Sequence, residues 1–201
     1  MSLPRAYFEA KYAQASDPWG FRSRWYEARK QSLVLACLQA RRYASVFEPG
    51  CSIGVTTASL AARADHVLAM DVAPQALDSA RAALGALAGH VEVVEGRVPA
   101  DWPEGHFELI VVSEVGYYLD AADCQLLAEL ASRSADELIV VHWRHRVADY
   151  PLDGDLARAI FAAAAADNGL KHALAHIEDD FQIDSWSRDH RSLAEREGLI
   201  Q

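Results

Sequence analysis

The sequence contains few cysteines and no long apolar run. Its three cysteines, Cys37, Cys51 and Cys124, are odd in number and widely separated, which argues against a disulfide framework and against a zinc site with paired spacing. The uninterrupted apolar stretches, such as Ala162–Ala166, are far shorter than the roughly 20 residues of a membrane-spanning helix. The N-terminus has charged and aromatic residues in place of an apolar signal core. We therefore expect reduced cysteines, a cytoplasmic protein and no membrane partner.

Basic residues are scarce as well. The chain has 19 Lys and Arg residues against 29 Asp and Glu residues, which gives a formal net charge of −10. Because affinity for nucleic acid comes largely from basic side chains that neutralise phosphates, this balance disfavours a nucleic-acid partner and suits a neutral or cationic small molecule. The length of 201 residues, the 51% hydrophobic content and the lack of a Pro/Gly/Ser-rich linker predict one domain spanning residues 1–201.

Two common nucleotide-binding fingerprints are missing. A dinucleotide-binding Gly-x-Gly-x-x-Gly that starts at Gly50 would need glycines at two positions where the chain has Ser52 and Val55. No lysine lies between Lys30 and Lys171, so this stretch has no phosphate-binding Gly-x-x-x-x-Gly-Lys-Ser/Thr motif. These absences disfavour a nicotinamide-dependent oxidoreductase and a P-loop enzyme.

A strand, a tight turn and a helix are predicted around the stretch Ser45–Gly54. A short apolar run ends at Glu48, breaks at a Pro-Gly pair and restarts as an Ala-rich amphipathic segment. Gly50 leaves room for the backbone to approach a ligand, and the start of the helix offers unpaired N–H groups. A second predicted strand, His66–Met70, is followed by Asp71, an acid placed to bind a ribose diol. Together these features favour a nucleotide site over an ordinary turn with a surface cap.

Strand and helix patterns continue to alternate along the chain and end in a hairpin. They predict an α/β, Rossmann-like three-layer sandwich with a seven-stranded, mostly parallel sheet whose last strand is antiparallel. Residues 1–43, rich in aromatic side chains, are predicted to form a helical cap that acts as a lid on a core of residues 44–201. The later strands are predicted at Val91–Glu95, Leu109–Val112, Leu138–Val141, Lys171–Ile177 and Phe181–Ser187.

The pattern Glu48-x-Gly50-x-Ser52-x-Gly54, followed by Asp71, resembles the first two motifs of the class I S-adenosylmethionine-dependent methyltransferases. The stretch Phe-Glu-Leu-Ile-Val-Val-Ser-Glu-Val at positions 107 to 115 resembles their fourth motif. The resemblance implies S-adenosylmethionine as cofactor and S-adenosylhomocysteine as product. It implies that Glu48 orients the turn and the methionine ammonium, that the two glycines flank the methionine and the ribose, and that Asp71 binds both ribose hydroxyls. Ser52 replaces the middle glycine of the family pattern.

The stretch after the third predicted strand departs from the family pattern. In the class I family an acid at this point commonly recognises the adenine amino group, whereas this chain reads Gly-Arg-Val at positions 96 to 98. We therefore expect the backbone at Arg97 and Val98 to contact the adenine. We interpret Cys51 as a small, tightly packed side chain of the cofactor turn. The other residues assigned to the cofactor are Val72, Ser113 and, near the methionine carboxylate, Arg29.

Longer segments are similar to the nodulation protein S branch of these enzymes. They are Asp-Pro-Trp-Gly-Phe (17–21), Trp-Tyr-Glu-Ala-Arg-Lys (25–30), Phe-Glu-Pro-Gly-Cys-Ser-Ile-Gly (47–54), Ser-Glu-Val-Gly-Tyr-Tyr-Leu (113–119) and His-Trp-Arg (142–144). Members of that branch include a methyltransferase that N-methylates the deacetylated terminal glucosamine of a chitooligosaccharide. The resemblance implies methyl transfer to a small-molecule acceptor, expected to be the nitrogen of an amino sugar or related metabolite. The alternatives are an O-methyltransferase of a natural-product hydroxyl and a non-catalytic cofactor-binding regulator; no oligomeric state is predicted.

Methyl transfer to an amine needs a positioned lone pair and the removal of a proton. Glu114 and His142 lie at the ends of the fourth and fifth predicted strands and are the predicted bases. No metal site is predicted: on strands His142 and His145 point to opposite faces, and the pair His172 and His176 lacks an acidic third ligand. The residues predicted to contact the acceptor are Trp19, Tyr117, His145 and Asp149.

Overall fold

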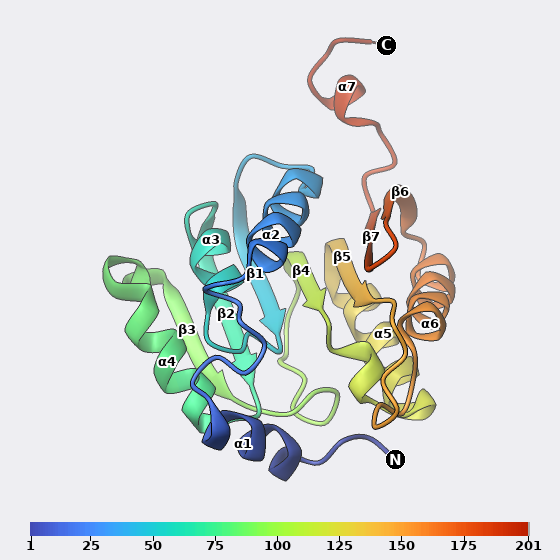
Figure 1. Cartoon of the computed structure of the whole chain (residues 1–201). Helices are drawn as coiled ribbons and strands as arrows, with labels where there is room; N and C mark the ends of the chain where they lie inside the picture. The colour runs from blue at the N-terminus through green and yellow to red at the C-terminus, as the bar shows by residue number, and fades with distance from the viewer. Residues whose placement is uncertain (201) are drawn as a thin grey trace.

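The computed structural model describes residues 1–200 and contains a seven-stranded sheet with the strand order β3-β2-β1-β4-β5-β7-β6 (Figure 1). Neighbouring strands are parallel except at β7, which runs antiparallel to both β5 and β6. The predicted Rossmann-like sheet with an antiparallel last strand is confirmed. The strands are β1 (Tyr43–Pro49), β2 (Ala64–Asp71), β3 (Val91–Glu95), β4 (Phe107–Ser113), β5 (Ala135–Trp143), β6 (Lys171–Ile177) and β7 (Phe181–Ser187).

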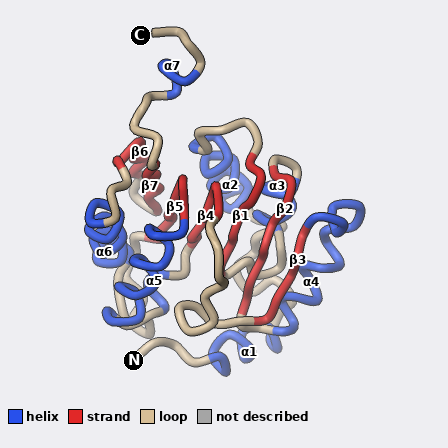
Figure 2. The backbone as a smooth tube through the Cα atoms, turned by 180° about the vertical axis from the view of Figure 1, so that it is seen from behind, coloured by secondary structure: helices blue, strands red, loops and turns tan. Residues whose placement is uncertain are grey.

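Helices cover both faces of the sheet (Figures 1 and 2). The helices α2, α3 and α4 lie on one face, α5 and α6 lie on the other, and α1 crosses the carboxyl ends of the strands (Figure 1). The short α7 projects beyond β7. The helices are α1 (Arg5–Gln14), α2 (Trp25–Cys37), α3 (Val55–Ala61), α4 (Pro74–Leu84), α5 (Ala121–Ser134), α6 (Gly154–Asp167) and α7 (Leu193–Arg196), with 3-10 turns η1 (Gly85–His90) and η2 (Gly116–Tyr118).

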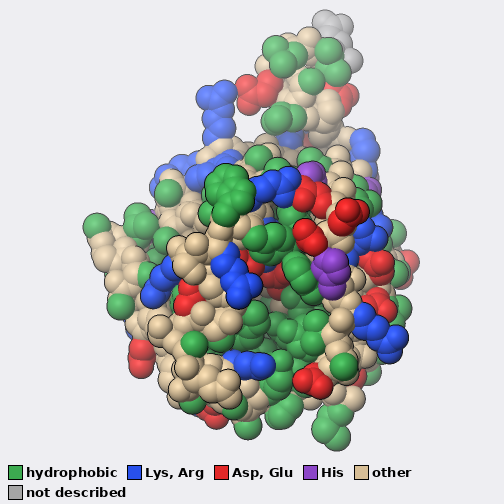
Figure 3. Space-filling view, in the orientation of Figure 1, with side chains coloured by type: hydrophobic (Ala, Val, Ile, Leu, Met, Phe, Trp, Pro, Cys, Tyr) green, Lys and Arg blue, Asp and Glu red, His purple; other side chains and the backbone are tan. Residues whose placement is uncertain are grey.

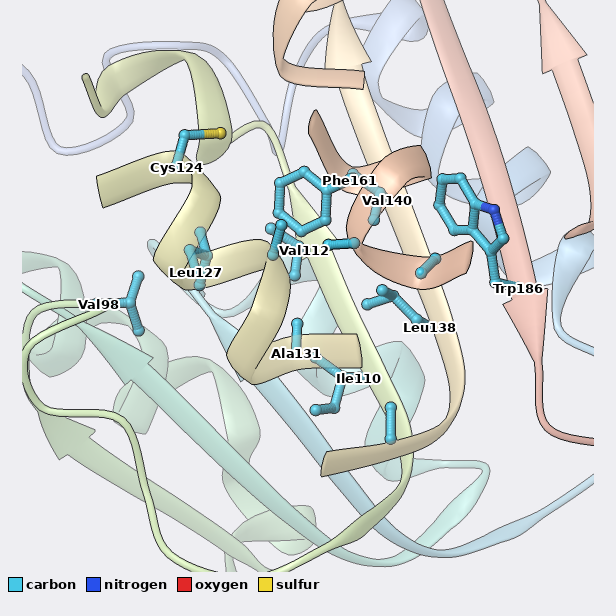
Figure 4. Packing of buried hydrophobic residues seen from close by; sticks show 14 of the residues in the cluster. Val98, Ile110, Val112, Cys124, Leu127, Ala131, Leu138, Val140, Phe161 and Trp186 are labelled. Atoms are coloured by element: carbon cyan, nitrogen blue, oxygen red, sulfur yellow. The ribbon is translucent and has the colours of Figure 1, made fainter. Parts of the chain in front are cut away.

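Successive residues of β4 point to opposite faces of the sheet. Leu109 and Val111 pack in the cluster that includes residues of α2 and α3, whereas Ile110 and Val112 pack with residues of α5 and α6. Figure 4 shows this second cluster, in which Phe161 of α6 lies beside Val112. Because both faces of the strand are buried, the sequence reads as a continuous apolar run without alternation.

Aspartate side chains start the two helices that follow β4 and β5. The Asp120 carboxylate accepts hydrogen bonds from the backbone N–H groups of Ala122 and Asp123, at 3.1 and 3.0 Å. The Asp153 carboxylate accepts one from the N–H of Leu156, at 2.8 Å. These N-caps satisfy donors that the first turn of a helix leaves free, and they fix the helix starts at the carboxyl edge of the sheet.

The three cysteines are buried and free. Within residues 1–200, no helix has the combined length and apolar character that crossing a membrane requires.

Candidate functional site

A cavity of about 370 Å³ opens at the carboxyl edge of the sheet, between the ends of β1, β2 and β4 and the helices α1 and α2. Hydrophobic side chains gather in the hollow on this face of the molecule (Figure 3). Nine of the residues predicted for the site line the cavity: Trp19, Gly50, Asp71, Val72, Arg97, Val98, Ser113, Glu114 and Tyr117.

The turn after β1 is held against the end of β2 by its own backbone. The N–H groups of Gly50 and Cys51 both donate to the carbonyl of Met70, at 2.7 and 2.9 Å. Gly50 has a φ of 74°, and a Cβ at this position would lie 2.5 Å from the Val115 side chain, so the turn requires glycine here. Backbone therefore borders the cavity directly. Gly54, with a φ of 79°, forms the N-cap of α3 and lies outside the cavity lining.

Asp71 ends β2 at the cavity and is 9% exposed. One oxygen of its carboxylate accepts a hydrogen bond from the N–H of Ser52 at 2.8 Å, and the other accepts one from the N–H of Ala73 at 2.9 Å. Burial raises the pKa of Asp71, and these backbone donors act in the opposite direction. The carboxylate is therefore fixed at one end of the cavity, where the sequence predicts a ribose diol.

Glu48 and Cys51 lie behind the turn and line a smaller adjoining cavity. Glu48 is buried, and its carboxylate accepts a hydrogen bond from Thr57 Oγ1 at 2.6 Å. Burial raises the pKa of Glu48 to about 8. Burial also raises the pKa of the Cys51 thiol, the opposite of what a nucleophile needs. Both residues support the turn from behind and do not line the main cavity.

We expect Glu48→Gln to remove a pH dependence of stability. The pKa of Glu48 is about 8 in the folded protein against an ordinary value of 4.5, so the folded state holds the proton more tightly. Its contribution to the free energy of unfolding should therefore fall as the pH rises, by about 3 kcal/mol between about pH 5.5 and pH 8. Urea unfolding at both pH values measures the fall. Glutamine keeps an acceptor for Thr57 but does not titrate, so equal pH slopes in the two proteins would contradict the prediction.

Helix α1, part of the predicted lid, contacts the turn through a pair of hydroxyl groups. Ser52, at the position where the family pattern has glycine, has a φ of 52°. Its Oγ lies 2.5 Å from the hydroxyl of Tyr12, which also lines the cavity. The substitution of serine for glycine thus adds a contact between the turn and the lid. The sequence prediction missed Tyr12, for which the aromatic-rich N-terminus is the only signal.

A buried lysine joins two carboxylates beside the turn, where Lys30, Glu27 and Glu114 line the smaller cavity together with Gly50 and Ser52. Lys30 Nζ donates to Glu114 Oε2 and lies 2.9 Å from Glu27 Oε2. Burial opposes the charge of Lys30, but the two carboxylates outweigh it and raise its pKa. Glu114, at the end of β4, has a φ of 59°, a conformation that costs free energy and that proteins retain most often at functional sites. Of these three residues only Glu114 was predicted, although the other two belong to the segment Trp-Tyr-Glu-Ala-Arg-Lys.

Aromatic side chains form the wall next to this charged cluster. The rings of Tyr117 and Tyr150 stack, with centroids 5.2 Å apart and an interplanar angle of 5°. Tyr118 meets Tyr150 edge to face at 4.7 Å, and Tyr26 meets Trp143 in the same way at 5.5 Å. All five side chains line the cavity. This part of the cavity is therefore lined mainly by aromatic rings, with the carboxylates of Glu27 and Glu114 as its nearby charges.

Arg29 does not line the cavity, contrary to the prediction. Its guanidinium makes two hydrogen bonds, of 2.7 and 2.6 Å, with the carboxylate of Glu178 in the β6–β7 turn. Successive residues of a helix point about 100° apart, so Arg29 and Lys30 of α2 face different neighbours. Lys30, not Arg29, is the cation that α2 places at the charged cluster.

The predicted base His142 and two of the predicted acceptor contacts, His145 and Asp149, also lie outside the cavity lining. His142 is 1% exposed and packs against Gly116, and burial lowers its pKa to about 4. It is a neutral core histidine and is not placed to take a proton from a ligand in the cavity. His145 instead forms a 2.7 Å hydrogen bond with Asp180, and Asp149 is exposed to solvent.

The model of the family Nodulation protein S (NodS) matches residues 7–141 of the chain. The chain belongs to this family. The nodulation protein S of Rhizobium tropici is 33% identical over 114 residues, which are 56% of this chain and 48% of that protein. The magnesium-protoporphyrin O-methyltransferase of Rhodobacter capsulatus is 34% identical over 96 residues, 47% of this chain and 42% of that protein. This NodS-family chain spans about half the length of the curated relatives it matches.

Solved structures agree with the family. A candidate methyltransferase from Pseudomonas syringae is 40% identical, with a TM-score of 0.71, and the match covers 82% of this chain and 100% of that one. The N-methyltransferase NodS from Bradyrhizobium japonicum WM9, in complex with S-adenosylhomocysteine, has a TM-score of 0.79 at 19% identity. The match covers 90% of this chain and 96% of that one. The family and the fold predicted from the sequence are confirmed, and the matches support the expected cofactor.

Proposed function

We propose that this NodS-family chain transfers a methyl group from S-adenosylmethionine to the nitrogen of a small-molecule amine, such as an amino sugar or related metabolite. The observation that carries the proposal is the continuous cavity at the carboxyl edge of the sheet. One end of this cavity has the fixed carboxylate of Asp71, and the other end has an aromatic wall. Glu27 and Glu114 also line the cavity, and together with Lys30 they adjoin the glycine-containing turn.

The residues at the first end fit the cofactor. The backbone at Gly50 can approach the methionine and ribose portions closely, because no side chain intervenes. The Asp71 carboxylate offers acceptors for the ribose hydroxyls, and Arg97 and Val98 border the space expected for the adenine. When bound there, S-adenosylmethionine supplies an electrophilic methyl group carried by a sulfonium.

The second end of the cavity fits an amine acceptor. Methyl transfer is an in-line displacement, so the chain's main task is to hold the acceptor nitrogen at about 3 to 3.5 Å from the methyl carbon in a site that excludes water. The aromatic wall of Tyr26, Tyr117 and Trp143 gives this end an apolar lining that favours the exclusion of water. Glu114 lines the same region and provides a carboxylate that favours a cationic group.

A hydroxyl acceptor is the second candidate, favoured by the match to the Rhodobacter capsulatus O-methyltransferase. The charges at the acceptor end argue for the amine, because two carboxylates opposed by one lysine attract an ammonium group and give a neutral hydroxyl no comparable advantage. Uptake of labelled methyl by paired amines and alcohols of the same carbon skeleton separates the two candidates.

Calorimetric titration with S-adenosylhomocysteine, NAD and NADH tests the cofactor. We expect the first to bind and the other two not to bind. Asp71→Asn should weaken S-adenosylhomocysteine binding about 10- to 100-fold, because hydrogen bonds to a charged group contribute about 1.5–3 kcal/mol. Asp65→Asn, an exposed substitution at the other end of β2, is the matched control. Failure of S-adenosylhomocysteine to bind, or tight binding of a nicotinamide nucleotide, would overturn the proposal.

A further inference from the structure

Helix α2 contributes a carboxylate, that of Glu27, to the lining of the main cavity and of the smaller cavity beside the turn. Glu27 and Glu114 both line the cavity, and their side chains are 11% and 15% exposed. They come from different parts of the chain, one from the lid and one from the end of β4. Lys30 Nζ contacts the Oε2 atom of each, and within residues 1–200 no hydrogen-bond donor contacts the Oε1 atom of either. Each carboxylate therefore keeps one oxygen for a ligand.

The two carboxylates form ion pairs with a single cation. This is the ammonium of Lys30, whose side chain is only 6% exposed; Arg24 also lines the cavity and acts on Glu27, but within residues 1–200 it forms an ion pair with neither carboxylate. A net negative charge that is largely withdrawn from water is costly unless a further cation pairs with it. Lys30 Nζ already lies 5.2 Å from the centroid of the Tyr26 ring, and Trp143, which meets Tyr26 edge to face, adds a second ring that favours a cation.

We infer that Glu27 and Glu114, bridged by Lys30, bind the acceptor as an ammonium ion, and that Glu27 takes the proton that the nitrogen must lose before methyl transfer. The inference rests on the proposed function. The ammonium completes a cluster of two negative and two positive charges, which explains why the lid helix places a carboxylate inside the cavity.

The step balances in atoms and charge. The ammonium gives one proton to the Glu27 carboxylate, which becomes a neutral acid, and the freed nitrogen lone pair forms a bond to the methyl carbon. The carbon–sulfur bond breaks, and its electron pair stays on sulfur, which becomes the neutral thioether of S-adenosylhomocysteine. The methylated nitrogen carries the positive charge. The proton on Glu27, whose side chain is 11% exposed, then passes to solvent after the product leaves.

The surroundings of Glu27 favour a role as proton acceptor over a role as a permanent member of an ion pair. Burial raises the pKa of Glu27, and Glu114 adds to this effect while Lys30 and Arg24 oppose it. Burial raises the pKa of the nearby Tyr26 phenol well above the range of the experiments below. Two further titratable groups, Glu48 and Cys51, line the smaller cavity with Glu27; burial raises the pKa of both, that of Glu48 to about 8. A carboxylate with a raised pKa is a stronger base at neutral pH than an ordinary glutamate.

Binding of paired probes tests the cation site. Protein saturated with S-adenosylhomocysteine is titrated at about pH 6.5 with glucosamine and glucose, n-propylamine and n-propanol, and benzylamine and benzyl alcohol. In at least one pair we expect the amine to bind about 10-fold more tightly than the alcohol, and Glu27→Gln to remove most of this preference. Glu104→Gln, an exposed substitution in the loop before β4, should keep it. The absence of any amine preference would overturn the inference.

The same titrations separate this inference from the proposed function. If S-adenosylhomocysteine fails to bind the wild-type protein, the proposed function fails. If S-adenosylhomocysteine binds, but Glu27→Gln weakens its binding as much as the binding of the amine, then Glu27 pairs with the ammonium of the cofactor. In that case only the present inference is wrong. We expect the affinity for S-adenosylhomocysteine to change less than about threefold in Glu27→Gln.

The pH profile of methyl transfer tests the proton step. With the amine that binds best, Glu27→Gln should lower kcat/KM about 100-fold at pH 7. The kcat/KM of this variant should recover as the pH approaches the pKa of the amine, because the solution then supplies the amine as its free base. Wild-type activity should fall as the pH falls through the pKa of Glu27. A uniform loss at every pH in Glu27→Gln would show a positioning residue instead of a proton acceptor, and it would overturn this part of the inference.

Discussion

Gly154→Ala should destabilise the protein by about 3 kcal/mol or more. Gly154 is the first residue of α6, and a Cβ at this position would lie 1.9 Å from the backbone carbonyl oxygen of Trp143, at the end of β5. A side chain could rotate away from such a contact, but a strand carbonyl cannot move without displacing the strand. The helix would therefore have to shift, although its Gly154 carbonyl also accepts a hydrogen bond from Gln182.

Urea unfolding of Gly154→Ala and of Gly89→Ala measures the effect. Gly89 lies in η1, where a Cβ would meet no heavy atom within 4 Å, so its substitution should change the free energy of unfolding by less than about 0.5 kcal/mol. Because Trp143 lines the cavity, the displaced helix should also weaken amine binding more than S-adenosylhomocysteine binding. A loss below about 1 kcal/mol in Gly154→Ala would contradict the prediction.

Most of the fold could be predicted because its signals are local. The hairpin shows this best: period-two patterns at Lys171–Ile177 and Phe181–Ser187 match β6 and β7 residue for residue. The central strands were predicted shorter than they are, as for Leu109–Val112 within β4 (Phe107–Ser113), because strand ends carry polar residues that hydropathy alone does not assign.

The sequence could predict which residues border the proposed cofactor end of the cavity, because they lie at the ends of neighbouring strands. Gly50 and Asp71 belong to consecutive strand ends of a parallel sheet, and such ends meet at one edge. The third-strand stretch at Arg97 and Val98 follows the same rule. Glu48 and Cys51 come from the same turn but line only the smaller cavity, because alternate positions of a tight turn face opposite sides.

The acceptor end could not be predicted in the same way, because it depends on how separate segments pack. The sequence gives no means of choosing between the adjacent cations Arg29 and Lys30, since the choice depends on the rotation of α2 against the sheet and on Glu178, about 150 residues away. For the adjacent residues His142 and Trp143, the sequence likewise gives no means of deciding which one lines the cavity. Neighbouring strand residues face opposite sides, and the histidine faces the core beside α6, whereas the tryptophan lines the cavity.

Lys30→Met should destabilise the protein by about 3–5 kcal/mol at pH 8, because it leaves Glu27 and Glu114 buried together without their shared cation. The loss should be smaller at about pH 5, because Glu27, whose pKa is raised by burial, can take up a proton there and so reduce the unpaired charge. Lys171→Met, at an exposed lysine, should change stability by less than about 0.5 kcal/mol at either pH.

A triple variant separates the loss of charge balance from the loss of packing. Lys30→Met combined with Glu27→Gln and Glu114→Gln removes all three charges and keeps similar side-chain volumes, so it should regain most of the stability that Lys30→Met loses at pH 8. It should nevertheless fail to bind amines, since no carboxylate remains for the ammonium. If the triple variant were as unstable as Lys30→Met at pH 8, the lysine would contribute by packing its methylene chain, and the charge argument for this cluster would be wrong. Recovery of stability without recovery of amine binding would instead show that the cluster is kept for the acceptor, because a neutral version folds equally well.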